Sequence, residues 1–269
     1  MWRASVFVAF SAVCLVIACQ RLFIFSGTWS HLVRTPHSLP AAAFGLPDPE
    51  HLFVDGVHAA LFLRATGSGV VALHFHGTGG SVHDTLWHLG VLARACACHV
   101  AAVEYRGHGR SRVGGPSERR LVADSCAVAR VVRERFPAAE LVAVGCSLGS
   151  AVAAQVLAAC GDEVGFAGVA LENPFSSLPA LAPRLLRWLL LDRFDGPGAM
   201  ASVRVPLLVI TSERDEVVPP AMSVEMLEAS PSRDKRHVIL RGCNHGDAGA
   251  HPEFLPASCL KQFFRKFGP

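Results

Sequence analysis

Charged residues are scarce in this chain of 269 residues. Asp, Glu, Lys and Arg make up 17% of it, and its 25 basic and 22 acidic side chains form no basic block. A nucleic-acid-binding surface needs clustered Lys and Arg, so the sequence argues against nucleic acid as a partner. Hydrophobic residues reach 51%, which argues against intrinsic disorder and supplies the core of one domain of roughly 200–250 residues.

Glycosylation sequons, internal repeats and zinc-binding spacings are also missing. Asn173 is followed by proline and Asn244 by His-Gly, so neither is a glycosylation acceptor. Nine cysteines show no framework spacing, and no second Cys/His pair accompanies Cys96 and Cys98 to bind zinc. We therefore expect buried free thiols, no metal or cofactor, and a catalytic domain that faces the reducing cytosol.

The N-terminus holds an uncharged, strongly apolar stretch. Sixteen residues without a charge follow Arg3, and if Arg21 snorkels to the interface the apolar stretch covers residues 4–25. We predict a single-pass signal anchor over residues 1–27 and a linker rich in Pro and Ala over 28–49. Two alternatives stay open: a signal peptide cleaved near Ala18, and a lipoprotein signal that makes Cys19 the lipidated N-terminus.

The rest of the chain alternates apolar runs with helical patterns. The runs that we expect to be strands are 70–75, 100–105, 141–144, 166–171, 207–211 and 237–240. The expected helices are 81–95, 118–136, 148–159, 220–229 and 253–267. Strands that are apolar throughout are typical of a mainly parallel sheet covered on both faces, so residues 50–269 are predicted to form one α/β domain.

Residues 145–149 read Gly-Cys-Ser-Leu-Gly and fit the pattern G-x-S-x-G. An apolar strand is expected directly before this pentapeptide and a helix directly after it, which is the context that the pattern requires. The glycines leave room for a sharp turn that exposes the hydroxyl of Ser147. We predict Ser147 as a nucleophile.

A serine nucleophile needs a base and an orienting acid. His245 follows the last expected strand, and Asp215 follows the strand at 207–211. The chain order Ser147, Asp215, His245 is the order that α/β-hydrolases use. Glu213, Glu216 and Glu172 are rival acids.

An acyl-transfer site also needs amides that stabilise an oxyanion. Leu148 supplies one N–H directly after the nucleophile, and Thr78 is the expected second donor, from the glycine-rich loop 76–80. His74 and His76 have no third ligand beside them, so a structural His-Gly turn is preferred to a metal site.

Six motifs in order carry a resemblance to a known family. They are His76–Gly80, Glu104–Ser111, Gly145–Gly149, Asn173–Ser177, Asp215–Pro219 and Asn244–His245. Together they resemble the α/β-hydrolase domain-containing (ABHD) serine hydrolases, above all the membrane-anchored Bem46-like group. The resemblance implies Ser147 as nucleophile, His245 as base, Asp215 as acid, and Thr78 and Leu148 as oxyanion donors. Thr78 stands where the group usually has Asn, and Glu104 where Asp is usual.

Residues 176–200 are long enough for one amphipathic lid helix. Leu185, Trp188 and Leu189 are expected on its apolar face, which either packs on the core or borders an acyl-chain site near lipid headgroups. Arg184, Arg187 and Arg193 would then lie near those headgroups.

We predict a membrane-anchored serine hydrolase that cleaves long-chain acyl esters or thioesters, either of S-acylated proteins or of lysophospholipids and monoacylglycerols. The first alternative is an esterase or peptidase of small soluble substrates. The second, of another class, is a catalytically silent membrane adaptor that keeps the hydrolase fold.

Overall fold

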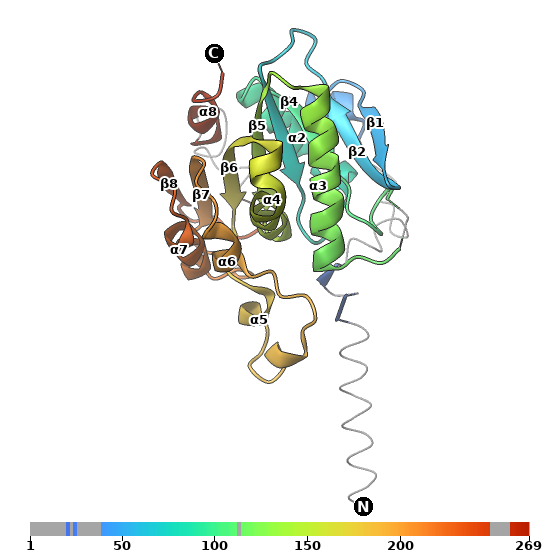
Figure 1. Cartoon of the computed structure of the whole chain (residues 1–269). Helices are drawn as coiled ribbons and strands as arrows, with labels where there is room; N and C mark the ends of the chain where they lie inside the picture. The colour runs from blue at the N-terminus through green and yellow to red at the C-terminus, as the bar shows by residue number, and fades with distance from the viewer. Residues whose placement is uncertain (1–19, 22–23, 26–38, 112–113, 248–258, 269) are drawn as a thin grey trace, which may run out of the picture.

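A computed structural model describes residues 20–21, 24–25, 39–111, 114–247 and 259–268. Its centre is an eight-stranded sheet with the order β1-β2-β4-β3-β5-β6-β7-β8 (Figure 1). The strands are β1 (Glu50–Val54), β2 (Val57–Phe62), β3 (Val70–Phe75), β4 (His99–Val103), β5 (Glu140–Cys146), β6 (Phe166–Glu172), β7 (Leu207–Ser212) and β8 (Lys235–Leu240). From β4 to β8 all neighbours pair in parallel, whereas β1 and β2 pair antiparallel. The predicted α/β architecture is confirmed.

The hairpin of β1 and β2 is absent from the sequence-based prediction. Its turn consists of Asp55 and Gly56, which both have a positive φ, of 50° and 78°. An Asp-Gly pair between apolar residues is a strong signal for a two-residue hairpin turn. The six residues of β2 are all buried, because β2 lies between β1 and the parallel strands.

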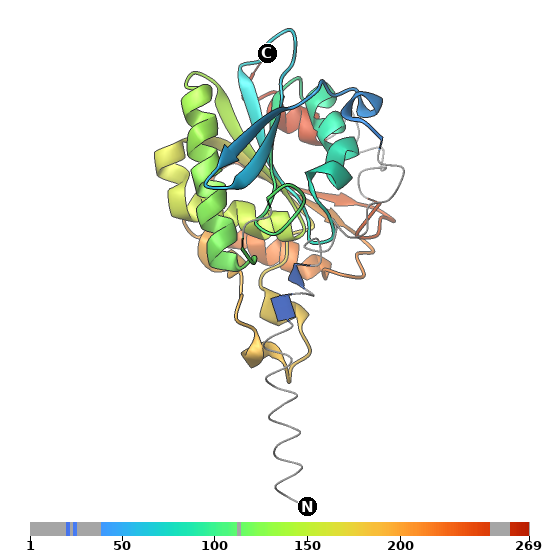
Figure 2. The same cartoon turned by 90° about the vertical axis from the view of Figure 1, so that its right-hand side faces the viewer.

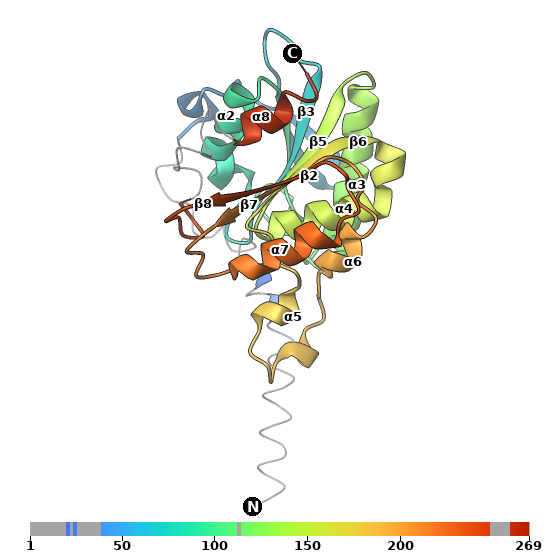
Figure 3. The ribbon, with the colours of Figure 1, turned by 90° about the vertical axis from the view of Figure 1, so that its left-hand side faces the viewer.

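Helices cover both faces of the sheet (Figure 3). One face carries α3 (Glu118–Arg135), α4 (Leu148–Val164), α6 (Gly196–Met200) and α7 (Pro220–Ala229). The other carries α2 (Leu86–Ala95), which follows the short 3-10 helix η3 (Val82–Thr85), and α8 (Cys259–Phe264). Residues 248–258 lie outside the description, so the predicted helix 253–267 is observed only from Cys259 onward.

Helix α4 is longer than its sequence indicates. It continues past residue 159, where the predicted helix ends, and stops at Gly165. Gly165 takes the left-handed conformation with φ 70°, and its N–H donates to the Gly161 carbonyl. This is the usual C-terminal cap, in which glycine adopts a positive φ without steric cost.

The predicted single lid helix is wrong. The segment instead forms α5 (Leu178–Leu181), the 3-10 turn η4 (Arg187–Leu189) and α6, joined by irregular chain. Pro183 is the physical reason, because proline removes a helical hydrogen bond and forces the residue before it to be extended. Ala182 accordingly has ψ 151°. Figure 2 shows this segment projecting from the end of the domain where residues 20–21 and 24–25 lie.

Most of the predicted anchor and much of the linker fall outside the described residues. Among those that are described, η2 (Ala41–Phe44) is a 3-10 turn, and Phe25 is buried in the core. No helix in the described part of the chain is both long and apolar enough to span a membrane.

One pair of cysteines corrects the expectation of free thiols. Cys126 on α3 and Cys160 on α4 form a disulfide, with Cα atoms 6.2 Å apart. The other described cysteines, at 96, 98, 146, 243 and 259, are free. The two cysteines are 34 residues apart in the sequence, and only the packing of α3 against α4 brings their thiols together. We expected the domain to face the cytosol partly because its thiols were expected to be free. The disulfide removes that part of the argument.

Reduction of this disulfide is expected to lower the free energy of unfolding by about 2–4 kcal/mol, because it frees a long loop in the unfolded chain. Thermal melts with and without reductant measure the effect. The double variant Cys126→Ser/Cys160→Ser should not respond to reductant, whereas Cys259→Ser should respond like the wild type. An equal response from all three proteins would contradict the pairing.

Candidate active site

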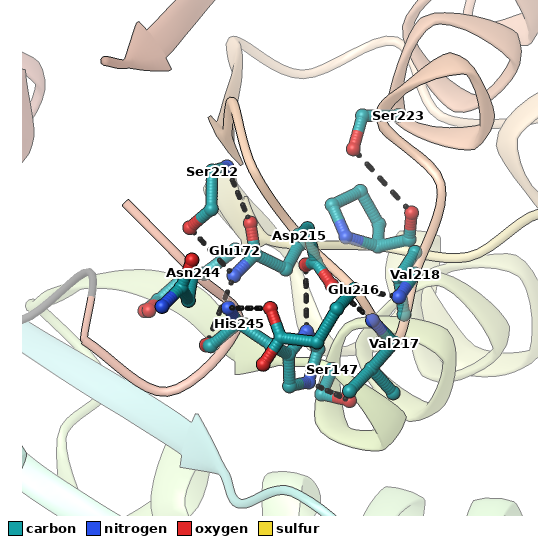
Figure 4. Close-up of polar contacts among 12 residues, drawn as sticks. Ser147, Glu172, Ser212, Asp215, Glu216, Val217, Val218, Ser223, Asn244 and His245 are labelled. Atoms are coloured by element: carbon teal, nitrogen blue, oxygen red, sulfur yellow. Dashed lines mark hydrogen bonds and ion pairs between the residues drawn. The ribbon is translucent and has the colours of Figure 1, made fainter. Parts of the chain in front are cut away.

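Ser147 lies on a sharp turn between β5 and α4 (Figure 4). Its φ of 51° and ψ of −116° are rarely adopted by residues other than glycine. The neighbouring glycines are required sterically: a Cβ on Gly145 would overlap the Gly149 carbonyl, and a Cβ on Gly149 would overlap the Phe75 carbonyl. The turn therefore brings α4 close to β3 and lifts the Ser147 side chain above the strand ends.

Three side chains form a hydrogen-bonded row. His245 Nε2 lies 3.1 Å from Ser147 Oγ, and His245 Nδ1 lies 2.6 Å from Asp215 Oδ2. The Asp215 side chain is 1% exposed and the His245 side chain 19% exposed. The row is thus shielded at its acidic end and open to solvent at the histidine, as proton transfer to a substrate requires.

Backbone amides hold the Asp215 carboxylate in place. Its Oδ1 accepts hydrogen bonds from the N–H groups of Val217 (2.9 Å) and Val218 (2.7 Å). This leaves Oδ2 for the imidazole, so the position of the acid is set by its own loop.

The three rival acids have other partners. Glu213 accepts the Gly242 amide at 2.9 Å, and Glu216 accepts the backbone N–H of His245 at 3.3 Å. Glu172 lies below the nucleophile, with its carboxylate 3.7 Å from His88 Nε2. Among these four carboxylates, only that of Asp215 is bonded to the imidazole of His245.

Asn173 is a supporting residue whose role the sequence did not reveal. Its side chain accepts the Ser212 N–H at 2.7 Å and donates to Ser212 Oγ (3.1 Å) and to the His245 carbonyl (3.3 Å). It therefore ties the end of β6 to β7 and to the histidine loop. Asn173 has a positive φ of 45°, and its place at a strand end before a proline was the available signal.

The two predicted oxyanion donors belong to the segments next to Ser147. Leu148 begins α4, and loop 76–80 runs so close that a Cβ on Gly77 would be 3.7 Å from Ser147 Cβ. Within the described residues, neither the Leu148 N–H nor the Thr78 N–H donates a hydrogen bond. Both amides are therefore free to bind an oxygen.

Buried polar groups support the loop that carries Thr78. Tyr105 Oη donates to the His76 carbonyl at 2.8 Å, and the Glu104 carboxylate accepts the Val82 N–H and lies 3.4 Å from His76 Nε2. Glu104 has one methylene more than the aspartate that is usual at this position, and its carboxylate still reaches the loop.

A second polar cluster, of Glu172, His88 and His74, lies close to the turn that carries Ser147. Burial raises the pKa of Glu172 to about 8 and lowers that of His88 to about 4. Burial also lowers the pKa of His74, whose ring meets that of His88 edge-on at 5.0 Å. At neutral pH the site therefore rests on mostly uncharged groups. No group of three or more potential metal ligands occurs in the described part of the chain.

The lid residues lie apart from this row of side chains. Leu189 is buried, whereas Trp188 and Leu185 are exposed. The hydrogen bonds that join segment 185–193 to elements outside the lid run to Gln20, Arg21 and Glu118. The structure thus links this segment to the N-terminal residues and α3.

The sheet order and the strained turn at Ser147 are those of an α/β-hydrolase. So is the position of Ser147, His245 and Asp215 at the carboxyl ends of the parallel strands. The solved esterase Pf2001 of Pyrococcus furiosus has the same fold, with TM-score 0.70 and 16% identity over 88% of this chain and 97% of the esterase. A family profile described as serine aminopeptidase, S33, matches residues 68–194.

Sequence relatives indicate which group of α/β-hydrolases the chain belongs to. An uncharacterised protein of Mycobacterium tuberculosis, Rv2307c, is 33% identical over 75% of this chain and 70% of its own. Protein bem46 of Schizosaccharomyces pombe is 28% identical over 65% of this chain and 61% of its own. The lysophosphatidylserine lipase ABHD12 of Danio rerio is 28% identical over 55% of this chain and 44% of its own. The chain belongs to the Bem46-like group of ABHD proteins.

Replacement of Glu172 by glutamine tests the buried cluster. The folded protein holds the Glu172 proton up to a pKa of about 8, whereas the unfolded chain releases it near 4.5. Stability from the protonated group is therefore present below pH 4.5 and lost as the pH rises to about 8. Glutamine stays neutral, so E172Q should gain stability relative to the wild type across this interval.

Denaturant unfolding at about pH 5 and about pH 8 measures the gain. The control is Glu163→Gln, because the exposed Glu163 pairs with Arg130, which lowers its pKa. That variant should show no such gain. A stability difference between E172Q and wild type that is the same at both pH values would contradict the burial effect.

Proposed function

We propose that this protein is a serine hydrolase that cleaves acyl esters or thioesters. The hydrogen-bonded row of Ser147, His245 and Asp215 supports the proposal most directly, since it combines a nucleophile, a base and an orienting acid. The two free amides beside Ser147 supply the remaining part of an acyl-transfer site.

In the proposed reaction, Ser147 Oγ attacks the acyl carbonyl while His245 Nε2 takes its proton. Asp215 stabilises the imidazolium, and the amides of Leu148 and Thr78 stabilise the oxyanion. His245 then gives the proton to the leaving alcohol or thiol, and an acyl-enzyme remains. A water molecule, deprotonated by His245, attacks the acyl-enzyme and releases the acid and free Ser147.

The proposed substrate carries a long acyl chain, as in a lysophospholipid, a monoacylglycerol or an S-acylated protein. The name of the ABHD12 relative, a lysophosphatidylserine lipase, supports a lipid substrate. The exposed side chains of Leu185 and Trp188 add apolar surface of the kind that lipids contact.

We further propose that residues 1–27 anchor the domain to a membrane. Their apolar sequence supports the anchor. The disulfide between Cys126 and Cys160 favours a domain on the oxidising side of that membrane over the cytosolic orientation expected from the sequence.

The alternative of a small-substrate esterase or peptidase draws support from the serine aminopeptidase profile. Comparing turnover of thioester, lysophospholipid and peptide substrates separates it from the lipid-directed enzyme. The silent adaptor is disfavoured by the strained backbone of Ser147, because such strain costs free energy that a binding module has no reason to keep.

Fluorophosphonate labelling tests the nucleophile. The probe should label the wild type, should not label Ser147→Ala, and should label His245→Ala far more slowly because the base is lost. Ser68→Ala is the matched control, since Ser68 lies just before β3, at the opposite end of the strands. Labelling of a folded Ser147→Ala protein at the wild-type rate would overturn the assignment.

A pair of substitutions at Thr78 tests the oxyanion donor. Proline removes the N–H and should lower kcat about 10²–10³-fold, which is typical for loss of one oxyanion donor. Alanine keeps the N–H and should leave kcat nearly unchanged. If Thr78→Ala loses as much activity as a folded Thr78→Pro, the hydroxyl rather than the amide is the important group.

A further inference from the structure

An exposed apolar tip stands at one end of the domain. Leu185, Trp188 and Leu191 are 84%, 72% and 56% exposed, although they lie within seven residues of one another. Clustered large apolar side chains are uncommon on a water-exposed surface and mark a contact site. The chain around them bends at η4, so the tip projects from the domain (Figure 2).

The tip is fastened to the residues that follow the apolar N-terminal stretch. Gln20 donates to the Leu189 carbonyl and accepts the Leu191 N–H, at 3.3 and 2.8 Å. Arg21 forms an ion pair of 2.8 Å with the buried Asp192. The tip and the N-terminal residues therefore form one connected surface.

Arginines surround this apolar tip. We define the docking face as segment 184–193, residues 20–21 and Arg119 and Arg120 at the start of α3. It holds six arginines, at positions 21, 119, 120, 184, 187 and 193, and one acidic side chain, Asp192. Glu118, which borders this face, is a second acidic side chain, and its carboxylate accepts the Arg193 N–H at 2.7 Å. The Asp192 carboxylate is already occupied by Arg21 and by the Glu118 N–H.

A groove crosses the same face. It has a volume of about 920 Å³, and Arg119, Arg120 and Arg21 line it together with Leu191. Apolar side chains beside a basic groove match a bilayer surface, where aromatic residues enter the interface and arginines bind anionic headgroups.

We propose that this docking face binds the surface of an anionic lipid bilayer. The proposal goes beyond the hydrolase function and stands even if Ser147 is inert. Helix α3 follows β4, and Ser147 follows β5, so the basic groove and the nucleophile lie at the same edge of the parallel strands. Docking therefore holds the catalytic edge close to lipid.

Fluorescence of Trp188 tests the contact. In the full chain, Trp2, Trp29 and Trp87 are replaced by phenylalanine, and the protein is reconstituted into phosphatidylcholine vesicles with brominated acyl chains and about a quarter phosphatidylserine. Trp188 emission should be blue-shifted and quenched. In a control chain, Trp188→Phe is added and Ile239→Trp supplies the only tryptophan. Residue 239 is exposed on the edge strand β8, so its emission should not be quenched. Water-like, unquenched emission from Trp188 would overturn the proposal.

The second measurement is the dependence of Trp188 quenching on anionic lipid. Quenching of Trp188 should be stronger with phosphatidylserine than in pure phosphatidylcholine, and salt should weaken the difference. Arg119→Gln/Arg120→Gln should remove this difference, whereas Arg233→Gln, at the opposite end of the strands, should keep it. Equal quenching of the wild type in both lipids would overturn the anionic preference.

Fluorophosphonate labelling of the same proteins separates this proposal from the proposed hydrolase function. The docking variants should be labelled at the wild-type rate, because none of the changed residues contacts Ser147. In the chain whose only tryptophan is Trp188, absent labelling with normal quenching would count against the hydrolase, and absent quenching with normal labelling would count against docking.

Discussion

The rest of the structure depends on the strained turn at Ser147. A residue with a side chain takes a positive φ there, and it can do so only because Gly145 and Gly149 leave space for the crossing backbone. Hydrogen bonds hold the turn: the Ser147 N–H donates to the Glu172 carbonyl, and Ser150 Oγ donates to the carbonyls of Gly145 and Glu172. The strain is thus balanced by the surrounding sheet, and the Ser147 side chain is held in place by the fold itself.

The site is fixed from several strands at once. Asp215 is held by its own loop, the His245 loop is tied down by Asn173, and Tyr105 holds the loop on the oxyanion side. Buried groups beneath the turn stay mostly neutral, because burial disfavours the charged forms of Glu172 and His88.

The apolar segment after β6 shows how sequence pattern and structure diverge. Its leucines and tryptophan fit a helix, but Pro183 breaks the pattern, and the pieces pack where Gln20 and Arg21 meet Asp192. This arrangement gives the domain a face that is apolar at its tip and basic around it. The proposed membrane contact and the proposed catalytic side chains thereby lie at the same end of the molecule, on separate residues.

The sequence by itself determined the parallel strands, the helices between them and the order of Ser147, Asp215 and His245, because these follow from apolar periodicity and local turn chemistry. It also contained the Asp-Gly signal of the first hairpin. Only the tertiary structure decided which carboxylate meets His245, that Cys126 bonds to Cys160, and where residues 185–193 lie. Those outcomes depend on side chains far apart in the chain, and their distances are set by the packing of strands and helices.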